Sequence, residues 1–264
     1  MGRTRALLLL VSVLLVLSGC SAFFEFNAFS GLDKPSVPNP SRYQGSGGLA
    51  NLQSDLSSPS IVDALKTHPD TVDTILGNLD SAYKVTTTTP STPDQQTAAI
   101  LYAQLALQST SGDELVNNIA DTVVNNPSGN LKSMLASIVP SDVAGNITKF
   151  TAMVDNLLAA EVVYINLGNS IPLVGTPPGM NMGDVAQKAA VALLMVTILD
   201  AVENTPAPGT YTQAQATNQL FALINNQPNS IANINISDPF ADMGSGNPPW
   251  LVHIFDAAGA PYPA

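Results

Sequence analysis

Few side chains in this sequence could act as catalysts or metal ligands. Its two histidines, His68 and His253, lie far apart, and neither belongs to a His-Glu-x-x-His pattern that would bring two imidazoles to one zinc ion. Asp238, Asp242 and Asn247 carry oxygens that suit calcium, but their spacing departs from that of an EF-hand loop and favours a simple turn. The sequence also lacks a Gly-x-Ser-x-Gly motif and a phosphate-binding glycine loop. We therefore expect no catalytic, cofactor or metal site.

The only cysteine, Cys20, carries the most specific signal in the chain. It follows Leu17-Ser18-Gly19 at the end of an apolar run, Ala6 to Leu17, which begins after Arg3 and Arg5. A charged start, a short apolar stretch and small residues are typical of a secretory signal peptide. The run is shorter than the roughly 20 apolar residues that span a bilayer. A lone cysteine has no partner for a disulfide within the chain.

The Leu-Ser-Gly-Cys sequence resembles the lipobox of bacterial lipoproteins. The resemblance implies that residues 1–19 are a removed signal peptide and that Cys20 is lipidated as the first mature residue. Because two or more acyl chains anchor a protein stably, it also implies permanent attachment to a membrane of the cell envelope. Ser21 stands where many inner-membrane lipoproteins carry Asp, which favours the outer membrane and a periplasmic location for the domain.

The charge of the chain restricts its partners. The sequence has 9 basic and 20 acidic residues, and removing residues 1–19 removes two of the basic ones, so the net charge changes from -11 to 7 − 20 = -13. Nucleic acid and anionic lipid headgroups are disfavoured partners, because binding them depends on Lys and Arg that neutralise phosphates. Membrane attachment is therefore expected through the lipid at Cys20.

The segment after the cysteine is predicted to be an N-terminal arm and linker, residues 20–56. Four phenylalanines of this arm either insert into the membrane interface or dock on the domain; the second is favoured, because interfaces prefer Trp and Tyr. They are Phe23, Phe24, Phe26 and Phe29. The prolines and glycines between Gly31 and Gly48 predict a surface loop or tether.

From residue 57 to residue 264, helix-start signals recur and predict a single α-helical domain. Ser58 and Thr92 each precede a proline, and Thr212 precedes Gln215 at capping-box spacing. Apolar residues follow these starts at steps of three and four. No segment alternates as a strand would. We predict an all-α fold of roughly eight helices, arranged as a helical-hairpin array or an irregular bundle.

Two of the predicted helices are long. One is expected to run from Ser141 or Asp142 to Gly168, and the other from Asp184 to Glu203. The second is apolar on all sides over residues 189–199, so we expect it at the centre of the fold. Because Lys188 and Asp200 bracket only this short segment, it is interpreted as a core helix and not as a membrane span.

The helix starts also suggest a repeat. Those at residues 58, 92 and 127–128 are about 34 to 36 residues apart, and each interval holds two predicted helices. In plan and length this is similar to a tetratricopeptide-like unit, over residues 58–165 at most. In its lipid-anchored, helical layout, the chain is similar to the periplasmic accessory lipoproteins of TRAP-type transporters.

Residues 170–183 form the one long predicted connection that is also apolar. Methionine-rich loops of this kind either line adaptable binding surfaces or cover a core. The residues that would contact a ligand here are Pro172, Leu173, Val174, Met180, Met182 and Met195. The leading prediction is a non-catalytic, lipid-anchored protein-interaction or scaffold module whose partner is another envelope protein. The alternative is a periplasmic transport accessory or carrier that binds a small apolar ligand near residues 170–199.

Overall fold

Every regular element in the described part of the chain is a helix. The computed structural model describes residues 36–45, 47–84, 89–125, 131–204, 211–227 and 248–260, so the leader, Cys20, the arm up to residue 35 and the Asp238/Asp242 turn lie outside the described residues. The elements are η2 (Pro40–Tyr43), α2 (Gly48–Leu56), α3 (Pro59–Lys66), α4 (Pro69–Tyr83), α5 (Pro93–Ser109), α6 (Gly112–Asn125), α7 (Leu131–Ile138), α8 (Ser141–Ala144), α9 (Ile147–Val174), α10 (Met182–Glu203), α11 (Gln213–Ile224) and α13 (Pro249–Ala257). The predicted all-α class is confirmed, with eleven α-helices in this part against the expected eight.

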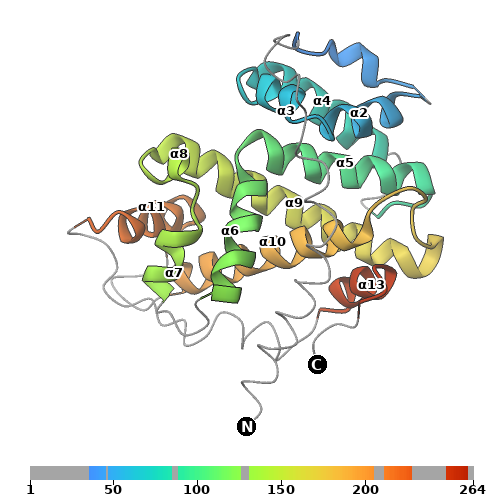
Figure 1. Cartoon of the computed structure of the whole chain (residues 1–264). Coiled ribbons are helices and arrows are strands. Elements are labelled where there is room, and N and C mark those ends of the chain that lie inside the picture. The colour runs from blue at the N-terminus through green and yellow to red at the C-terminus, as the bar shows by residue number, and fades with distance from the viewer. Residues whose placement is uncertain are drawn as a thin grey trace.

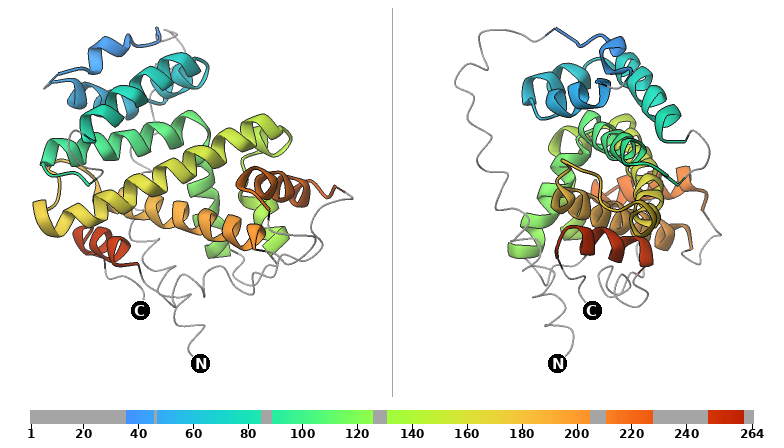
Figure 2. Two further views of the ribbon diagram at one scale, coloured as in Figure 1. Left: turned by 180° about the vertical axis from the view of Figure 1, so that it is seen from behind. Right: turned by 90° about the vertical axis from the view of Figure 1, so that its right-hand side faces the viewer.

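Helix α9 organises the packing. It contacts α5, α6, α8, α10, α11 and α13, and Figures 1 and 2 show it passing between α5 on one side and α10 and α13 on the other. Both α5 and α13 are distant from α9 in the sequence. The described helices therefore form an irregular bundle around α9, whereas in a hairpin array each helix would pack mainly on its sequence neighbours.

Two predicted helix starts have the expected hydrogen bonds. The Thr92 hydroxyl accepts from the Gln95 amide at 3.2 Å, and the Thr212 hydroxyl accepts from the Gln215 amide at 3.4 Å. The Gln215 side chain accepts in return from the Thr212 amide at 2.9 Å, which completes a capping box. Such bonds satisfy amides that have no partner within the helix, so they fix where the helix begins.

The long helix expected from Ser141 to Gly168 is interrupted and also extends further. Helix α8 ends at Ala144, and α9 begins after Asn146, whose side-chain oxygen accepts from the amides of Thr148 and Lys149 at 3.1 and 3.2 Å. At its other end α9 continues through Pro172 to Val174, so residues 170–174, which were expected to be irregular, are helical.

The helical domain begins earlier than residue 57. Residues 48–56, which were expected to belong to the linker, form α2, and Leu52 and Leu56 lie in the hydrophobic core. Tyr43, in the preceding 3₁₀ turn, is also buried there. Packing of these apolar side chains stabilises a segment whose glycines and prolines favour a loop.

Two helices, α9 and α10, are long and apolar enough to cross a bilayer, by length and composition alone. In the most apolar 18-residue window of α10, 61% is buried inside the protein, whereas the corresponding value for α9 is 39%. Helix α10 contacts α6, α9, α11 and α13, which confirms its predicted central position. Helix α9 leaves much more of its apolar surface uncovered.

Candidate functional site

The six residues predicted to contact a ligand are divided between one end of the bundle and its core. Leu173, at the end of α9, is 79% exposed, whereas Met182 and Met195 on α10 are 5% and 1% exposed. Because a helix rises about 1.5 Å per residue, Met182 and Met195 are about 20 Å apart along α10. These two methionines therefore do not line one small-molecule site. Pro172 and Val174 flank Leu173 at the end of α9, and Met180 lies in the connection to α10, two residues before Met182.

At that end of the bundle, a proline, a glycine and a histidine join α9 to α13. Pro172 has no amide hydrogen, so the carbonyl of Gly168, four residues earlier, has no donor within the helix. His253 Nδ1 lies 3.1 Å from that oxygen. A carbonyl oxygen only accepts, so Nδ1 carries the hydrogen and donates it. The half-buried histidine thus has a structural partner.

Gly168 also sets the distance between α9 and α13. A Cβ atom at this position would lie 2.1 Å from the Trp250 carbonyl oxygen, which no side chain tolerates without a shift of backbone. The glycine is therefore required for the close approach that lets His253 reach its carbonyl. The Gly168, Pro172 and His253 group is called the α9–α13 joint below.

The connection between α9 and α10 is fastened to two other helices. The fully buried Gln96, on α5, donates through Nε2 to Ser170 Oγ and to the Gly175 carbonyl, each at 2.9 Å. Gln53, on α2, donates to the Gly179 carbonyl at 3.0 Å. The bonds to Gly175 and Gly179 satisfy backbone carbonyls in an irregular segment, and all three bonds hold the predicted binding loop against the bundle.

Lys188 is a buried cation between α6 and α10. Its Nζ lies 3.3 Å from Asp113 Oδ1 and 3.1 Å from Asp184 Oδ2, and its side chain is 8% exposed. Burial lowers the pKa of Lys188, but the charges of Asp113 and then Asp184 outweigh burial and raise this pKa above its ordinary value. The amine therefore stays protonated, and it has no free electron pair for nucleophilic attack. Its role is to link α6 to α10.

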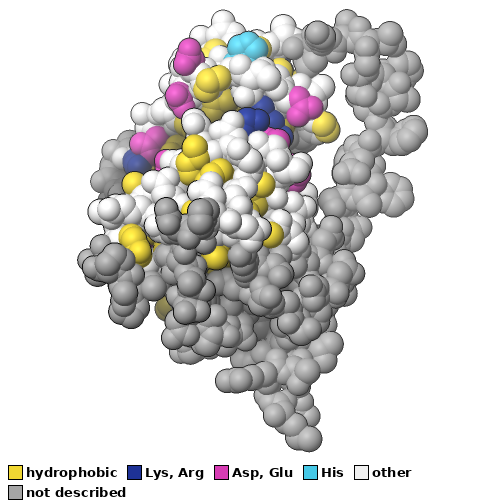
Figure 3. All heavy atoms as spheres, turned by 90° about the vertical axis from the view of Figure 1, so that its left-hand side faces the viewer, with side chains coloured by type: hydrophobic (Ala, Val, Ile, Leu, Met, Phe, Trp, Pro, Cys, Tyr) yellow, Lys and Arg dark blue, Asp and Glu magenta, His cyan; other side chains and the backbone are white. Residues whose placement is uncertain are grey.

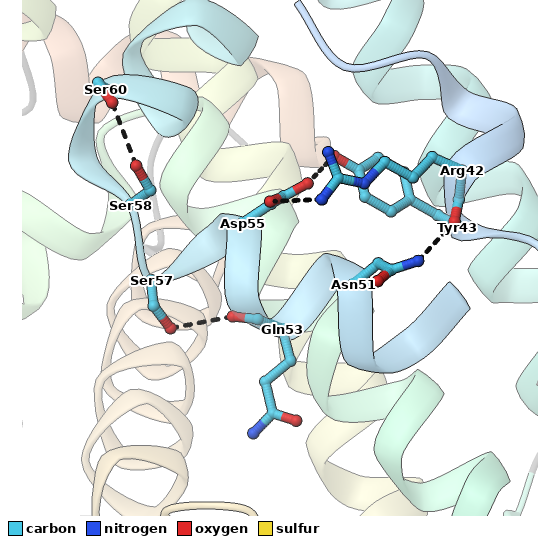
Figure 4. Close-up of polar contacts among 8 residues, drawn as sticks. All are labelled: Arg42, Tyr43, Asn51, Gln53, Asp55, Ser57, Ser58 and Ser60. Carbon is cyan, nitrogen blue, oxygen red and sulfur yellow. Dashed lines mark hydrogen bonds and ion pairs between the residues drawn. The ribbon is translucent and has the colours of Figure 1, made fainter. Parts of the chain in front are cut away.

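A second buried ionic group lies where the N-terminal segment enters the domain (Figure 4). The Tyr43 hydroxyl donates to Asp55 Oδ2 at 2.9 Å, and Arg42 Nη2 lies 3.4 Å from Asp55 Oδ1. Asn51 donates to the Arg42 carbonyl at 3.3 Å. Burial, and then the hydrogen bond to Asp55, raise the pKa of Tyr43, so its hydroxyl remains a donor. Arg42, Tyr43, Asn51 and Asp55 are called the N-terminal junction below.

Gly48 completes the N-terminal junction at the start of α2. A Cβ atom there would lie 2.2 Å from the Tyr43 carbonyl oxygen, so only glycine allows the 3₁₀ turn to fold back on the helix. The side chain of Asp55 is 7% exposed, and burying a carboxylate is tolerated because it is both ion-paired and hydrogen-bonded. The first described residues are thus firmly attached to the bundle.

Cations on the described surface are already engaged. Each Lys or Arg whose side chain is described lies within 4.0 Å of an Asp: Arg42 with Asp55, Lys66 with Asp63, Lys84 with Asp80, Lys149 with Asp142, and Lys188 with Asp113 and Asp184. On the face in Figure 3, the Lys, Arg, Asp and Glu side chains occur in a few separate places among hydrophobic and uncharged atoms. No group of three or more His, Cys, Asp or Glu that could hold a metal occurs among the described residues.

Sequence reasoning did not identify the α9–α13 joint or the N-terminal junction. The one local signal for the joint was a glycine four residues before a proline, within an apolar helix. Nothing local connects Lys188 to Asp113 or Tyr43 to Asp55, because those partners meet only when their helices pack.

Comparison with protein-family models, with curated proteins and with solved structures finds no match. The function is therefore inferred from the residues of this chain and from their arrangement.

Proposed function

We propose that this protein is a lipid-anchored component of a bacterial cell envelope, with the outer membrane favoured, whose helical domain binds another envelope protein without catalysing a reaction. The lipobox-like sequence at Cys20 supplies the anchor. The observation that carries the proposal is the N-terminal junction, because it attaches the chain that follows the anchor to the bundle at Tyr43 and Asp55.

The distance between the anchor and the bundle has an upper limit. Residues 20–35 separate Cys20 from the described part of the chain, and sixteen residues extend at most about 55 Å. A lipid at Cys20 would hold the bundle within that distance of the bilayer. Such a restraint raises the local concentration of the domain near partners in the same membrane.

The states of Lys188 and His253 support a non-catalytic role. Lys188 is protonated and shared by two carboxylates, and His253 donates to a backbone carbonyl. In the described arrangement Lys188 is not available as a nucleophile or as a general base, and Nδ1 of His253 is engaged by a structural partner. The alternative, a carrier of a small apolar molecule near residues 170–199, stays a prediction, and the separation of Met182 from Met195 does not favour it.

The test of anchoring compares palmitate labelling of the full chain with that of the Cys20→Ala variant in a bacterial host. We expect label in the wild-type protein only. Because an uncleaved leader could itself hold the variant in a membrane, a matched control replaces residues 1–20 by an ordinary cleavable secretory leader. That control should be found in the soluble periplasmic fraction, whereas the wild type sediments with membranes. An unlabelled wild-type protein in the cytosol would refute the proposal.

A further inference from the structure

Helix α9 carries all the strongly exposed large apolar side chains in the described part of the chain. These are Ile147, Val162 and Leu173, which are 39%, 51% and 79% exposed. Water contact with large apolar groups is unfavourable, and several such groups along one side of a helix can contact a binding partner. Because all three residues belong to α9, the exposed side of this helix is the candidate interaction surface.

These side chains lie on one side of α9, together with the polar residues Thr151, Asp155 and Asn169. Successive residues of a helix are rotated by about 100°, so Leu173, eleven positions after Val162, points within about 20° of it. By the same rule the partly buried Leu158 and Ile165 lie within about 60° of Val162. We call Ile147, Leu158, Val162, Ile165 and Leu173 the α9 stripe. In the left view of Figure 2, α9 crosses the molecule with no described helix in front of it.

The charges in and beside the stripe are negative. Asp155 is exposed and lies two helical turns before Val162, on the same side of α9; its Oδ1 accepts from Gln213 Nε2 of α11 at 3.3 Å, and its other carboxylate oxygen has no hydrogen-bond partner among the described residues. Glu161 is next to Val162 in the sequence, and its pKa is raised first by burial and then by the charge of Asp200 on α10. The nearest lysine in the sequence, Lys149, is already paired with Asp142. The complementary partner is therefore both apolar and cationic.

Two other possible partners, a second copy of this chain and a membrane surface, fit the α9 stripe less well than an amphipathic helix. A second copy of this chain would bring its own carboxylates, and each of its described cations is already paired with an Asp. The leaflet surface of an anionic membrane carries charge of the same sign as Asp155. By contrast, an amphipathic helix presents apolar residues at three- and four-residue spacing and can carry basic residues on either side of them.

We propose that the α9 stripe is the docking surface for an amphipathic helix of another envelope protein, with an apolar ridge flanked by Lys or Arg. This inference rests on the proposed function and specifies the surface and the chemistry of its partner. Helix α9 has 28 residues and is therefore about 42 Å long, which is sufficient for several turns of a partner helix. Val162 and Leu173 would contact the ridge, and Asp155 would pair with a flanking cation.

The test places a photo-cross-linking amino acid at position 162 of the full-length, lipidated protein in its native envelope. The cross-linked peptide is then sequenced by mass spectrometry. We expect a peptide from a different protein, with apolar residues at helical spacing beside Lys or Arg. The same cross-linker at position 73, an exposed residue of α4, is the matched control and should not yield this peptide.

Charge reversal provides the second arm of the test. Asp155→Lys replaces an attractive charge pair by a repulsive one and should lower the yield of the position-162 adduct about two- to tenfold, whereas Asp73→Lys should leave it unchanged. Thermal unfolding of both variants should stay close to that of the parent, because both positions are exposed and Asp155→Lys removes only one exposed hydrogen bond, from Gln213. This comparison separates an electrostatic contribution to docking from an effect on folding.

An adduct with a second copy of this chain, with another segment of the same chain or with lipid would overturn the inference. So would the absence of an adduct, or an adduct insensitive to Asp155→Lys. Palmitate labelling at Cys20 is measured independently. A labelled protein that fails the cross-linking test would therefore retain its proposed anchoring and lose only this docking surface.

Discussion

Gly168 shows how one missing methyl group determines the packing of two helices. Alanine at this position would place its Cβ 2.1 Å from the Trp250 carbonyl, so α13 would have to move away from α9. We expect Gly168→Ala to lower the free energy of unfolding by about 1–3 kcal/mol, the usual cost of overpacking. Urea unfolding followed by circular dichroism at the helical band measures this change.

Gly77, in the middle of α4, provides the matched control. A Cβ atom there has nothing within 4 Å, and alanine is favoured over glycine within helices by up to about 1 kcal/mol. Gly77→Ala should therefore stabilise the protein slightly. Equal effects of the two substitutions would contradict the proposed role of Gly168.

The hydrogen bond from His253 to the Gly168 carbonyl should depend on Pro172. His253→Ala leaves that buried carbonyl without a donor, and we expect a loss of about 1–3 kcal/mol in the free energy of unfolding. Pro172→Ala supplies an amide that can complete the ordinary helical bond to Gly168. In that background, His253→Ala should cost about 1 kcal/mol less. Additive effects in this double-mutant cycle would show that the two residues act independently.

At the scale of elements, Lys188 links α6 to the central helix α10. Removing one partner of a buried ion pair is strongly destabilising, because the remaining charges lose their compensation. Lys188→Ala also removes buried methylene groups, so we expect a loss of about 3 kcal/mol. Chemical unfolding of the variant and the parent measures it.

Lys149 is the control for Lys188, since it pairs with Asp142 at 3.4 Å but has a side chain that is 55% exposed. Exposed ion pairs contribute about 0.2–1 kcal/mol, so Lys149→Ala should have a small effect. If Lys188→Ala were as mild as Lys149→Ala, the cation would not be the link between α6 and α10 that the structure indicates.

Across the whole molecule, the shifted pKa values point to instability in alkali. Burial raises the pKa of Tyr83 to about 12, and burial also raises the pKa values of Tyr43 and Tyr164. Burial lowers the pKa of Lys188, but the nearby carboxylates of Asp113 and Asp184 outweigh burial, so this pKa lies above its ordinary value. Each of these groups binds its proton more tightly in the folded protein than in the unfolded chain. The stability that they contribute is thus fully present below about pH 10, the value of unfolded tyrosine, and is lost as pH rises through the folded values.

We therefore expect the free energy of unfolding to decrease between about pH 10 and pH 12. Urea unfolding at several pH values measures it, while absorbance near 295 nm records tyrosine ionisation. The buried tyrosines should ionise together with unfolding. Stability that rises over this range, or ionisation of these tyrosines in the folded protein near pH 10, would contradict the assignment.

Local sequence signals were sufficient for the helix class and for several helix starts. The hydroxyls of Thr92 and Thr212 cap their helices as expected, because capping depends on residues only three positions apart. At Pro172, by contrast, the local signal gave the wrong helix end. Locally this proline predicts the end of a helix, but α9 continues past it because His253, from a distant segment, satisfies the carbonyl that the proline leaves free.

The candidate sites were harder to predict for the same reason. Tyr43 meets Asp55, Lys188 meets Asp113 and Gln96 meets Ser170 only after helices pack, and these pairings have no fixed spacing in the sequence. The α9 stripe could not be predicted either, because Val162 and Leu173 are apolar residues of an apolar helix and cannot be distinguished from core residues by sequence. The lipid anchor at Cys20 stays a sequence-based prediction.

Two kinds of information therefore specify this protein. The sequence by itself determined the all-α class, the caps and the apolar character of α9 and α10, because those properties depend on residues within a few helical turns. Only the tertiary structure decided that α10 is enclosed while α9 leaves Val162 and Leu173 in solvent. Two helices with similar composition differ in this way because burial depends on which neighbours pack around each of them, and that choice is made by contacts across the whole chain.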